Sequence, residues 1–473
     1  MSFDSIAPAA TALPEAALHN FEHELVGSAL LPRHNAYAAA CASFERSVAH
    51  RPALVVKAGA SEDVSAAVRF AGDHGLGVAV QSSGHGACVP ADDSGLLLST
   101  RELRGVRVHP GTRWARVHAG ARWVDVLNAT SRFGLAPLHC GALNSSAVSG
   151  LLGGGIGPLS RRYGQTADHV EEIRVVTADG SRLVTSARED SGLFWGLRGG
   201  RGQLGVVTSA TLELVPVPVV YGGTLTFDPA DTQKVLTRYA QWVADVPDTV
   251  ASRLSLRRLP ALSAALRHAN DPLVLQITVL DVEPGPTSEA LLSPLLGAAP
   301  IVDGSLDRMP YAAAARDWDE PGQPVATLSR ALVLRRLGKE ALGAIASFAK
   351  LRGGHHFSLT LHHMGGALAR RAVLPGAAGY FPGAEFALRT AVHLDHTQGV
   401  RAALQAQEAL RTELAPWVYP KGSPGFLSGL DLGPAAARMA FGPSWDALRA
   451  LKDLYDPTDM FRYEPSLNAA YGH

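Results

Sequence analysis

From Arg51 onward, short apolar runs alternate with glycine, aspartate and proline turns, a pattern typical of strands. ALVVKA and GVAVQSS flank SEDVSAAVRFAGDHG, which reads as a helix with Ser61 as its N-cap and Gly75 just past its last turn. Ahead of them, HNFEHELV and YAAACASFERSVA carry apolar residues at helical spacing. The pattern therefore predicts helices over residues 1–50, followed by strand–helix–strand order.

The pattern resets at about Tyr221. Before it, EEIRVVTADGSRLVTS reads as a hairpin that turns at Asp179-Gly180. After it, GGTLTFDP, SRLSLRR, LVLQITVLDV, HHFSLTLHH and EFALRTAVHL read as strands, with helices at DTQKVLTRYAQWVADV and KEALGAIASFAKLRG. The final SWDALRALKDLYDPTDMF reads as a helix that stops at Asp456-Pro457. Strands mixed with helices predict an α+β fold in which an antiparallel sheet carries helices on one face.

Composition narrows the class of protein. The 473 residues suggest two or three domains. With 43 basic and 43 acidic residues, the chain has no net charge that would draw it to nucleic acid or an anionic membrane. Three cysteines argue against a disulfide framework, and neither an export signal nor a membrane-spanning run is present. We expect a cytoplasmic protein, monomeric or homodimeric, with no nucleic-acid or membrane partner.

Three glycine-rich segments are the candidates for chemistry. QSSGHG (residues 81–86) follows a strand, SGLLGGGIG spans residues 149–157, and WGLRGGRGQLGVVTSATLEL spans residues 195–214. Small residues let backbone N–H groups approach a ligand closely, although QSSGHG alone also fits a turn with a surface histidine. Neither a strand–GxGxxG–helix unit nor GxxxxGK[ST] is present, so a nucleotide bound here needs a different scaffold.

In this order, SGHG, GGGIG, RRYG, TADG, RGGRGQLGVVT and a C-terminal YDPxxxF resemble the FAD-linked oxidases of the vanillyl-alcohol oxidase superfamily, in its berberine-bridge-enzyme-like branch. The resemblance runs from about Leu25 to Asn468. It implies a two-domain PCMH-type fold: an FAD-binding domain of residues 1–215, a substrate domain of residues 216–414 with an antiparallel sheet backed by helices, and a segment, residues 415–473, that returns to the FAD domain.

The resemblance makes His85 the residue bonded covalently to the flavin 8α-methyl group. Gln81 and Ser83 stand where the family has arginine and glycine. Many members add a bond from a cysteine to flavin C6, but Cys140 comes too early for that position. We expect a single bond, with Cys140 beside the flavin, and a second bond through Cys140 is the alternative. The other implied cofactor contacts are Ser82, Ser83, Gly84 and Gly86 at the pyrophosphate, Gly154, Gly155 and Gly157 against the cofactor, Ser145 and Ser146 near the isoalloxazine, Gly205 and Val206 on the adenine side, and Tyr463 and Asn468 near the flavin ring.

The implied reaction is oxidation of a small secondary-metabolite substrate, with hydride transfer to flavin N5, a base that takes a proton, and O₂ as electron acceptor. A flavin-dependent oxidative cyclase or oxygenase of natural-product biosynthesis is the alternative. Many members supply the base as a tyrosine, but the matching segment GFLSGLDL places Phe426 and Ser428 where tyrosine and asparagine stand. The usual base is therefore missing, which favours the alternative.

Two strands of the second domain offer replacements. In FSLTLHH, the alternation of a strand puts Ser358, Thr360 and His362 on one face. His362 is the first candidate for the base because the unperturbed pKa of histidine suits neutral operation. Adjacent histidines such as His362 and His363 point to opposite faces, which is poor geometry for chelation, so we expect no metal site.

The second of these strands, EFALRTAVH, places Glu385 and Arg389 on its polar face. Glu385 is a further candidate base, whereas Arg389 is better suited to orient a substrate oxygen, because a guanidinium does not deprotonate in proteins. Tyr380 lies where the family packs an aromatic side chain on the substrate. The polar faces of both strands also fit a solvated sheet surface, and that alternative stays open.

Overall fold

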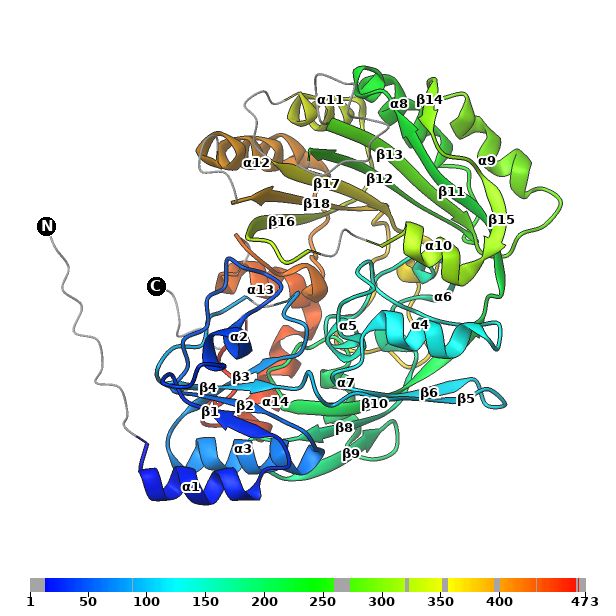
Figure 1. The fold of residues 1–473 in the computed structure, drawn as a ribbon. Coiled ribbons are helices and arrows are strands. Elements are labelled where there is room, and N and C mark those ends of the chain that lie inside the picture. The colour runs from blue at the N-terminus through cyan, green and yellow to red at the C-terminus, as the bar shows by residue number, and fades with distance from the viewer. Residues whose placement is uncertain are drawn as a thin grey trace, which may run out of the picture.

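Three sheets organise the chain in the computed structural model, which describes residues 13–86, 88–258, 273–319, 323–350, 356–394, 400–430, 432–464 and 467. Figure 1 shows a lower part built on two of these sheets and an upper part in which helices lie above the third. Asn468, one of the expected cofactor contacts, lies outside the described residues. No helix within the described ranges combines the length and the apolar character that crossing a bilayer needs.

The first sheet has the strand order β1-β2-β4-β3, with β2, β4 and β3 parallel. Helix α3 connects β2 to β3, so the predicted strand–helix–strand order is confirmed. Ser61 was the wrong N-cap: Ala60 holds that position, and the Asp63 carboxylate caps the helix by accepting the N–H groups of Gly59 and Ala60. Ahead of β2 the expected helices form only in part. The bounds are α1 Glu15–Glu24, β1 Ser28–Leu30, α2 Tyr37–Cys41, β2 Leu54–Lys57, α3 Ser61–Asp73, β3 Gly77–Gln81 and β4 Gly95–Ser99.

The second sheet is antiparallel, with the order β5-β6-β10-β8-β9, and β7 also pairs with β10. Its β8–β9 hairpin confirms the predicted turn, in which Gly180 adopts a φ of 79° that favours glycine. The bounds are β5 Val106–His109, β6 Trp114–His118, α4 Trp123–Ser131, β7 Leu135–Pro137, α5 Ala147–Leu152, α6 Ser160–Tyr163, β8 Val170–Val176, β9 Arg182–Ser186, α7 Ser191–Leu197 and β10 Val206–Pro216.

The third sheet is antiparallel, with the order β14-β11-β13-β12-β17-β18-β16, and β15 also pairs with β11. Helices α8, α9, α11 and α12 cover its upper face in Figure 1, where Leu359 and Leu388 join one apolar core with Ile345 of α11. The expected α+β arrangement is therefore confirmed. The bounds are β11 Val219–Phe227, α8 Thr232–Trp242, β12 Val250–Arg258, β13 Leu273–Asp281, α9 Ser288–Leu296, β14 Ile301–Asp303, β15 Asp307–Pro310, α10 Tyr311–Asp317, β16 Thr327–Leu334, α11 Lys339–Ala349, β17 Phe357–His363, β18 Phe386–His393 and α12 Val400–Leu414.

The end of the chain returns to the lower part of the molecule. Helices α13 (Pro434–Phe441) and α14 (Trp445–Tyr455) lie there, and Trp445 and Leu448 share an apolar core with Phe194 of α7. Helix α14 ends at Tyr455, as the Asp-Pro stop predicts. The third sheet therefore interrupts a lower part that is assembled from both ends of the chain.

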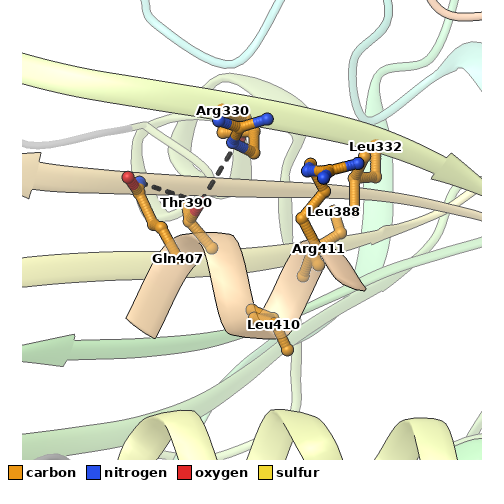
Figure 2. Close-up of a pocket in the computed structure, with 7 residues that line it drawn as sticks. All are labelled: Arg330, Leu332, Leu388, Thr390, Gln407, Leu410 and Arg411. Carbon is orange, nitrogen blue, oxygen red and sulfur yellow. Dashed lines mark hydrogen bonds between the residues drawn. The ribbon is translucent and has the colours of Figure 1, made fainter. Parts of the chain in front are cut away.

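The helix-covered face of the third sheet encloses one small cavity, shown in Figure 2. Its volume is about 10 Å³, which leaves room for about one water molecule. Thr390 of β18 accepts a hydrogen bond from Gln407 of α12 beside it. This cavity is too small to hold a substrate.

Candidate active site

The turn after β3 is fixed by backbone contacts on one side and open on the other. Gly84 has a φ of 78°, and its carbonyl oxygen accepts hydrogen bonds from the Ser43 hydroxyl at 2.9 Å and the Glu45 N–H at 3.2 Å. The Ser82 hydroxyl donates to the carbonyl oxygen of Ala119 at 3.0 Å. A Cβ added at Gly86, by contrast, would meet no atom within 4 Å. The open space at Gly86 is where a bound group can approach the backbone.

His85 stands at the open side of this turn with its ring partly exposed. The ring stacks on Phe44, with the centroids 3.6 Å apart, and its Nδ1 lies 2.9 Å from the hydroxyl oxygen of Ser83. The same hydroxyl oxygen accepts the N–H of Ser146 at 3.2 Å. The first glycine-rich segment and the start of the second therefore meet at Ser83, although they lie about 60 residues apart in the chain.

The glycines of residues 153–157 are explained by packing against protein. A Cβ at Gly154 would lie 2.7 Å from the Gln165 side-chain oxygen, and one at Gly155 would overlap the Thr166 hydroxyl. A Cβ at Gly157 would overlap the carbonyl oxygen of His139. Gly154 and Gly155 also have positive φ values, 94° and 79°. The run therefore lets several chain segments meet closely, whatever else it contacts.

Cys140 lies against α5 and α4. A Cβ at Gly150 would come within 2.8 Å of the Cys140 sulfur and 2.9 Å of the Trp123 ring nitrogen. Burial raises the pKa of the Cys140 thiol to about 12. Nearby, the Ser145 hydroxyl donates to the carbonyl oxygen of Ala142 at 2.7 Å, closing a local turn. The thiol is therefore protonated near neutral pH and is a poor nucleophile there.

The remaining expected cofactor contacts lie in two places. Gly205, with a φ of 147°, packs against β8, and the adjacent Val206 is buried at the start of β10. The Tyr463 hydroxyl donates to Asp92 at 2.8 Å and lies over Gly95, the first residue of β4. Because β3 and β4 are parallel and Gly95 pairs with the first residue of β3, Tyr463 lies at the opposite end of these strands from the His85 turn.

A second turn, residues 424–427, contacts the His85 turn. The carbonyl oxygen of Leu427 accepts a hydrogen bond from the Cys88 thiol at 3.4 Å. Phe426, which the resemblance aligns with the usual base, packs with Ile156 and Tyr419 against buried apolar residues of the third sheet and of the loop before β18. An apolar group with no proton to exchange thus occupies the expected place of the base.

The candidate residues on β17 and β18 lie on the sheet face opposite the helices. His362 is paired with Ala387 of β18 and Arg253 of β12, and Thr360 is paired with Arg389. Ala387 belongs to the apolar cluster that includes Phe426. The sheet register therefore places His362 next to a residue of the apolar cluster against which the 424–427 turn packs.

Glu385 and Tyr380 lie nearer the surface. Glu385 is largely exposed and lines an open pocket of about 530 Å³ with Arg335, Arg336 and Trp417, and partial desolvation of its carboxyl group raises its pKa. Tyr380 is 41% exposed, whereas its neighbour Phe381 is fully buried. Of the candidates in the second domain, His362 and Arg389 thus have the more enclosed positions.

Four charged residues around the two turns and the third sheet were not predicted from the sequence. Arg201 is buried and bonds to both turns, and Glu45 accepts hydrogen bonds from Thr327 of β16 while its N–H holds Gly84. Buried Arg161 donates to the carbonyl of Val250 and contacts His363, whose pKa burial lowers strongly. Lys421 is also buried, with a pKa lowered by burial to about 8. Of these four residues, only Arg201 had a feature visible in the sequence, because it lies within the glycine-rich segment of residues 195–214.

The comparison with family models decides the cofactor class. Residues 52–186 match the model described as FAD binding domain. The chain contains an FAD-binding domain. The matched residues include β3, the His85 turn and the glycine run of residues 153–157. The FAD domain also fits the local geometry, because Gly86 leaves open space beside a partly exposed His85.

Relatives and solved structures extend the match. The uncharacterised FAD-linked oxidoreductase YgaK of Bacillus subtilis is 28% identical over 389 residues, 79% of this chain and 82% of the relative. 6-Hydroxy-D-nicotine oxidase of Arthrobacter nicotinovorans superposes with a TM-score of 0.81 at 20% identity, covering 94% and 98% of the two chains. The BBE-like 1 protein of Physcomitrella patens gives 0.81 at 16% identity, covering 96% and 100%.

Glucooligosaccharide oxidase of Acremonium strictum, a structure described with 6-S-cysteinyl, 8α-N1-histidyl FAD, superposes with a TM-score of 0.79 at 18% identity, covering 96% and 99% of the two chains. The predicted resemblance to berberine-bridge-enzyme-like oxidases is therefore confirmed in fold, and the protein is an FAD-linked oxidoreductase. The FAD-linked oxidoreductase DDB_G0289697 of Dictyostelium discoideum and (R)-6-hydroxynicotine oxidase of Paenarthrobacter nicotinovorans, both 30% identical, align over 44% and 46% of this chain.

Proposed function

We propose that this protein is an oxidase that carries FAD covalently at His85, oxidises a small secondary-metabolite substrate and uses O₂ as electron acceptor. The observation that carries the proposal is the His85 turn. The imidazole is stacked on Phe44, bonded to Ser83 and partly exposed next to the open backbone of Gly86. A merely structural histidine needs no open backbone beside it. We further propose that the protein is cytoplasmic and is a monomer or homodimer.

In this proposal the FAD domain consists of residues 1–215 and 415–473, and residues 216–414 bind the substrate. The backbone of the His85 turn holds the pyrophosphate, and Ser146, whose hydroxyl caps α5, lies near the ring system. When bound, FAD accepts a hydride from a substrate C–H bond and passes the two electrons to O₂, which becomes H₂O₂. The residues of the chain orient the substrate and take its proton.

We expect one covalent bond. Attack on the flavin requires a thiolate, and a pKa of about 12 leaves the Cys140 thiol protonated at neutral pH. The Cys140 sulfur and the Trp123 ring also both lie close to Gly150 of α5. These observations favour His85 as the sole point of attachment, with Cys140 as a neighbour.

Acid precipitation of the purified yellow protein tests this attachment. The wild type is expected to carry flavin into the pellet, and His85→Ala is expected to leave it all in the supernatant. Cys140→Ala is the matched control, because it removes the other nucleophile and is expected to keep the pellet yellow. Flavin in the pellet of the His85→Ala variant would move the attachment to another residue.

His362 is proposed as the base. It lies on the sheet face that meets the 424–427 turn. Arg389 of β18, which pairs with Thr360, two residues before His362, is proposed to orient a substrate oxygen. Loss of a general base costs about 10²–10⁴ in rate. Replacing His362 with alanine should slow anaerobic flavin reduction within that range and leave the flavin spectrum unchanged. A variant that reduces its flavin at the wild-type rate would remove His362 from the mechanism.

One observation favours the alternative, an oxidative cyclase or oxygenase. Phe426 occupies the usual position of the base within an apolar cluster, so a reaction with no proton transfer at that position is compatible with the site. Product analysis separates the two functions. Simple oxidation and oxidative cyclisation both give one H₂O₂ per substrate with no oxygen from O₂ in the product, and cyclisation is recognised by the new ring in that product. An oxygenase instead places labelled oxygen from O₂ in the product.

A further inference from the structure

Arg201 makes an unusually complete set of contacts beside the His85 turn. Its side chain is buried, with 8% of its surface exposed. Nε donates to the Glu464 carboxylate at 2.8 Å, and Nη1 donates to the carbonyl oxygens of Pro424 at 2.9 Å and Leu427 at 3.4 Å. Nη2 donates to the carbonyl oxygen of Gly86 at 3.2 Å and contacts the Cys88 sulfur at 3.3 Å. These five contacts match the five N–H donors of a guanidinium.

This guanidinium joins three segments that lie far apart in the sequence. Gly86 directly follows His85, Pro424 and Leu427 bound the second turn, and Glu464 belongs to the C-terminal segment. The carbonyl of Gly84, on the other side of His85, is held by Ser43 and Glu45. The Cys88 thiol also donates to the carbonyl of Gly86, at 3.0 Å. Arg201 and Cys88 therefore anchor the chain on one side of His85, and Ser43 and Glu45 anchor it on the other.

The backbone of Arg201 supports a specific role. Its φ is 63°, in the left-handed region that is unfavourable for a residue with a side chain. A neighbouring glycine could occupy that conformation at no such cost. A buried arginine is also unfavourable without a partner, and Glu464 supplies the negative charge. The strained backbone, the burial and the charge pairing of Arg201 together indicate that its side-chain contacts with the two turns have a specific role.

We propose that Arg201 is a positioning residue for covalent attachment of FAD at His85, a role that rests on the proposed function. Attachment joins an imidazole nitrogen to the 8α carbon. The 8α carbon loses one hydrogen and the imidazole loses its N–H hydrogen, and the two electrons released pass to the flavin and then to O₂, which becomes H₂O₂. Arg201 takes no part in this electron flow. By fixing the carbonyl of Gly86, it keeps the imidazole at a constant position relative to the flavin.

The test uses Arg201→Gly, which removes the side chain and tolerates the positive φ. The matched control is Arg198→Gly. Arg198 is also buried and donates to the carbonyl groups of Phe194, Ala167, Leu374 and Pro375, none of which belongs to either turn. Each variant and the wild type are prepared free of flavin and then incubated with FAD, and acid-stable and acid-released flavin are measured over time. The ratio of the two separates attachment from binding.

Misplacement by about 1 Å costs about 10²-fold in an oriented reaction. Arg201→Gly is therefore expected to bind FAD but to attach it about 10- to 100-fold more slowly, with partial rescue in Arg201→Lys, which keeps the charge opposite Glu464. Arg198→Gly is expected to attach its bound FAD at the wild-type rate. If Arg201→Gly is insoluble, Arg201→Lys and Glu464→Gln carry the same comparison.

Two results would overturn the role of Arg201 and leave covalent attachment at His85 intact. These are attachment at the wild-type rate in Arg201→Gly, or equal slowing in Arg198→Gly. A wild type without acid-stable flavin would instead overturn covalent attachment itself, and the role of Arg201 with it. The two failures are therefore distinguishable in a single experiment.

Discussion

The His85 turn and the glycine run of residues 153–157 look alike in sequence but are built differently. At Gly86 the turn is open, and no atom lies within 4 Å of a Cβ added there. In the run, a Cβ at Gly155 or Gly157 would overlap protein atoms. Glycines can therefore be retained either to admit a ligand or to admit neighbouring chain segments, and composition alone does not separate these roles.

The largest expected effect is on stability, at the glycine run. Gly157→Ala forces a methyl group into the carbonyl oxygen of His139, and overpacking of this kind costs about 1–3 kcal/mol or more. Urea unfolding should show a lower free energy of unfolding for this variant. An unchanged urea midpoint would show that the chain around Gly157 accommodates the methyl group, and the contrast with the His85 turn would no longer hold.

A pH-dependent effect is expected at Lys421, which holds the segment that packs on this run. Its ammonium donates to the carbonyl of Ala378 and lies 3.9 Å from the centre of the Phe381 ring. Burial lowers its pKa from 10.5 to about 8, so between these values the unfolded chain binds more protons than the folded one. The stability that Lys421 contributes therefore rises with pH from about 8 to 10.5 and is constant below about 8.

Lys421→Met isolates this contribution. The free energy of unfolding of the wild type, minus that of the variant, should increase between pH 8 and 10.5 in urea titrations. Subtraction removes the other groups that titrate in the same range. A difference that falls with pH would mean that the lysine is stabilised, not penalised, in its charged form.

The smallest stability effect is expected at Gly86. Gly86→Ala adds a methyl group to open space at a φ that is not positive, so the free energy of unfolding should stay within about 0.5 kcal/mol of the wild type. The added methyl group should instead hinder FAD, lowering the fraction of flavin in the acid pellet. Reduced stability with normal flavin content would contradict the distinction between the two segments.

Much of the fold was predictable because it depends on local patterns. Alternation identified β17 and β18 and the faces on which Leu359 and Leu388 lie, since a strand repeats every two residues. The β8–β9 turn and the stop after α14 followed from Asp-Gly and Asp-Pro. The prediction failed at Ser61, because the cap comes from Asp63 in the first turn of α3, which also holds Val26 and Gly27 far upstream.

The sequence by itself determined the strand and helix pattern, the resemblance to FAD-linked oxidases and the candidacy of His85. Only the tertiary structure decided which glycines are open, that Tyr463 lies at the far end of the β3 and β4 strands, and that Arg201 joins two turns. The physical reason is separation along the chain. Arg201 is 115 residues from Gly86 and 223 from Pro424, and no local pattern records contacts over such distances.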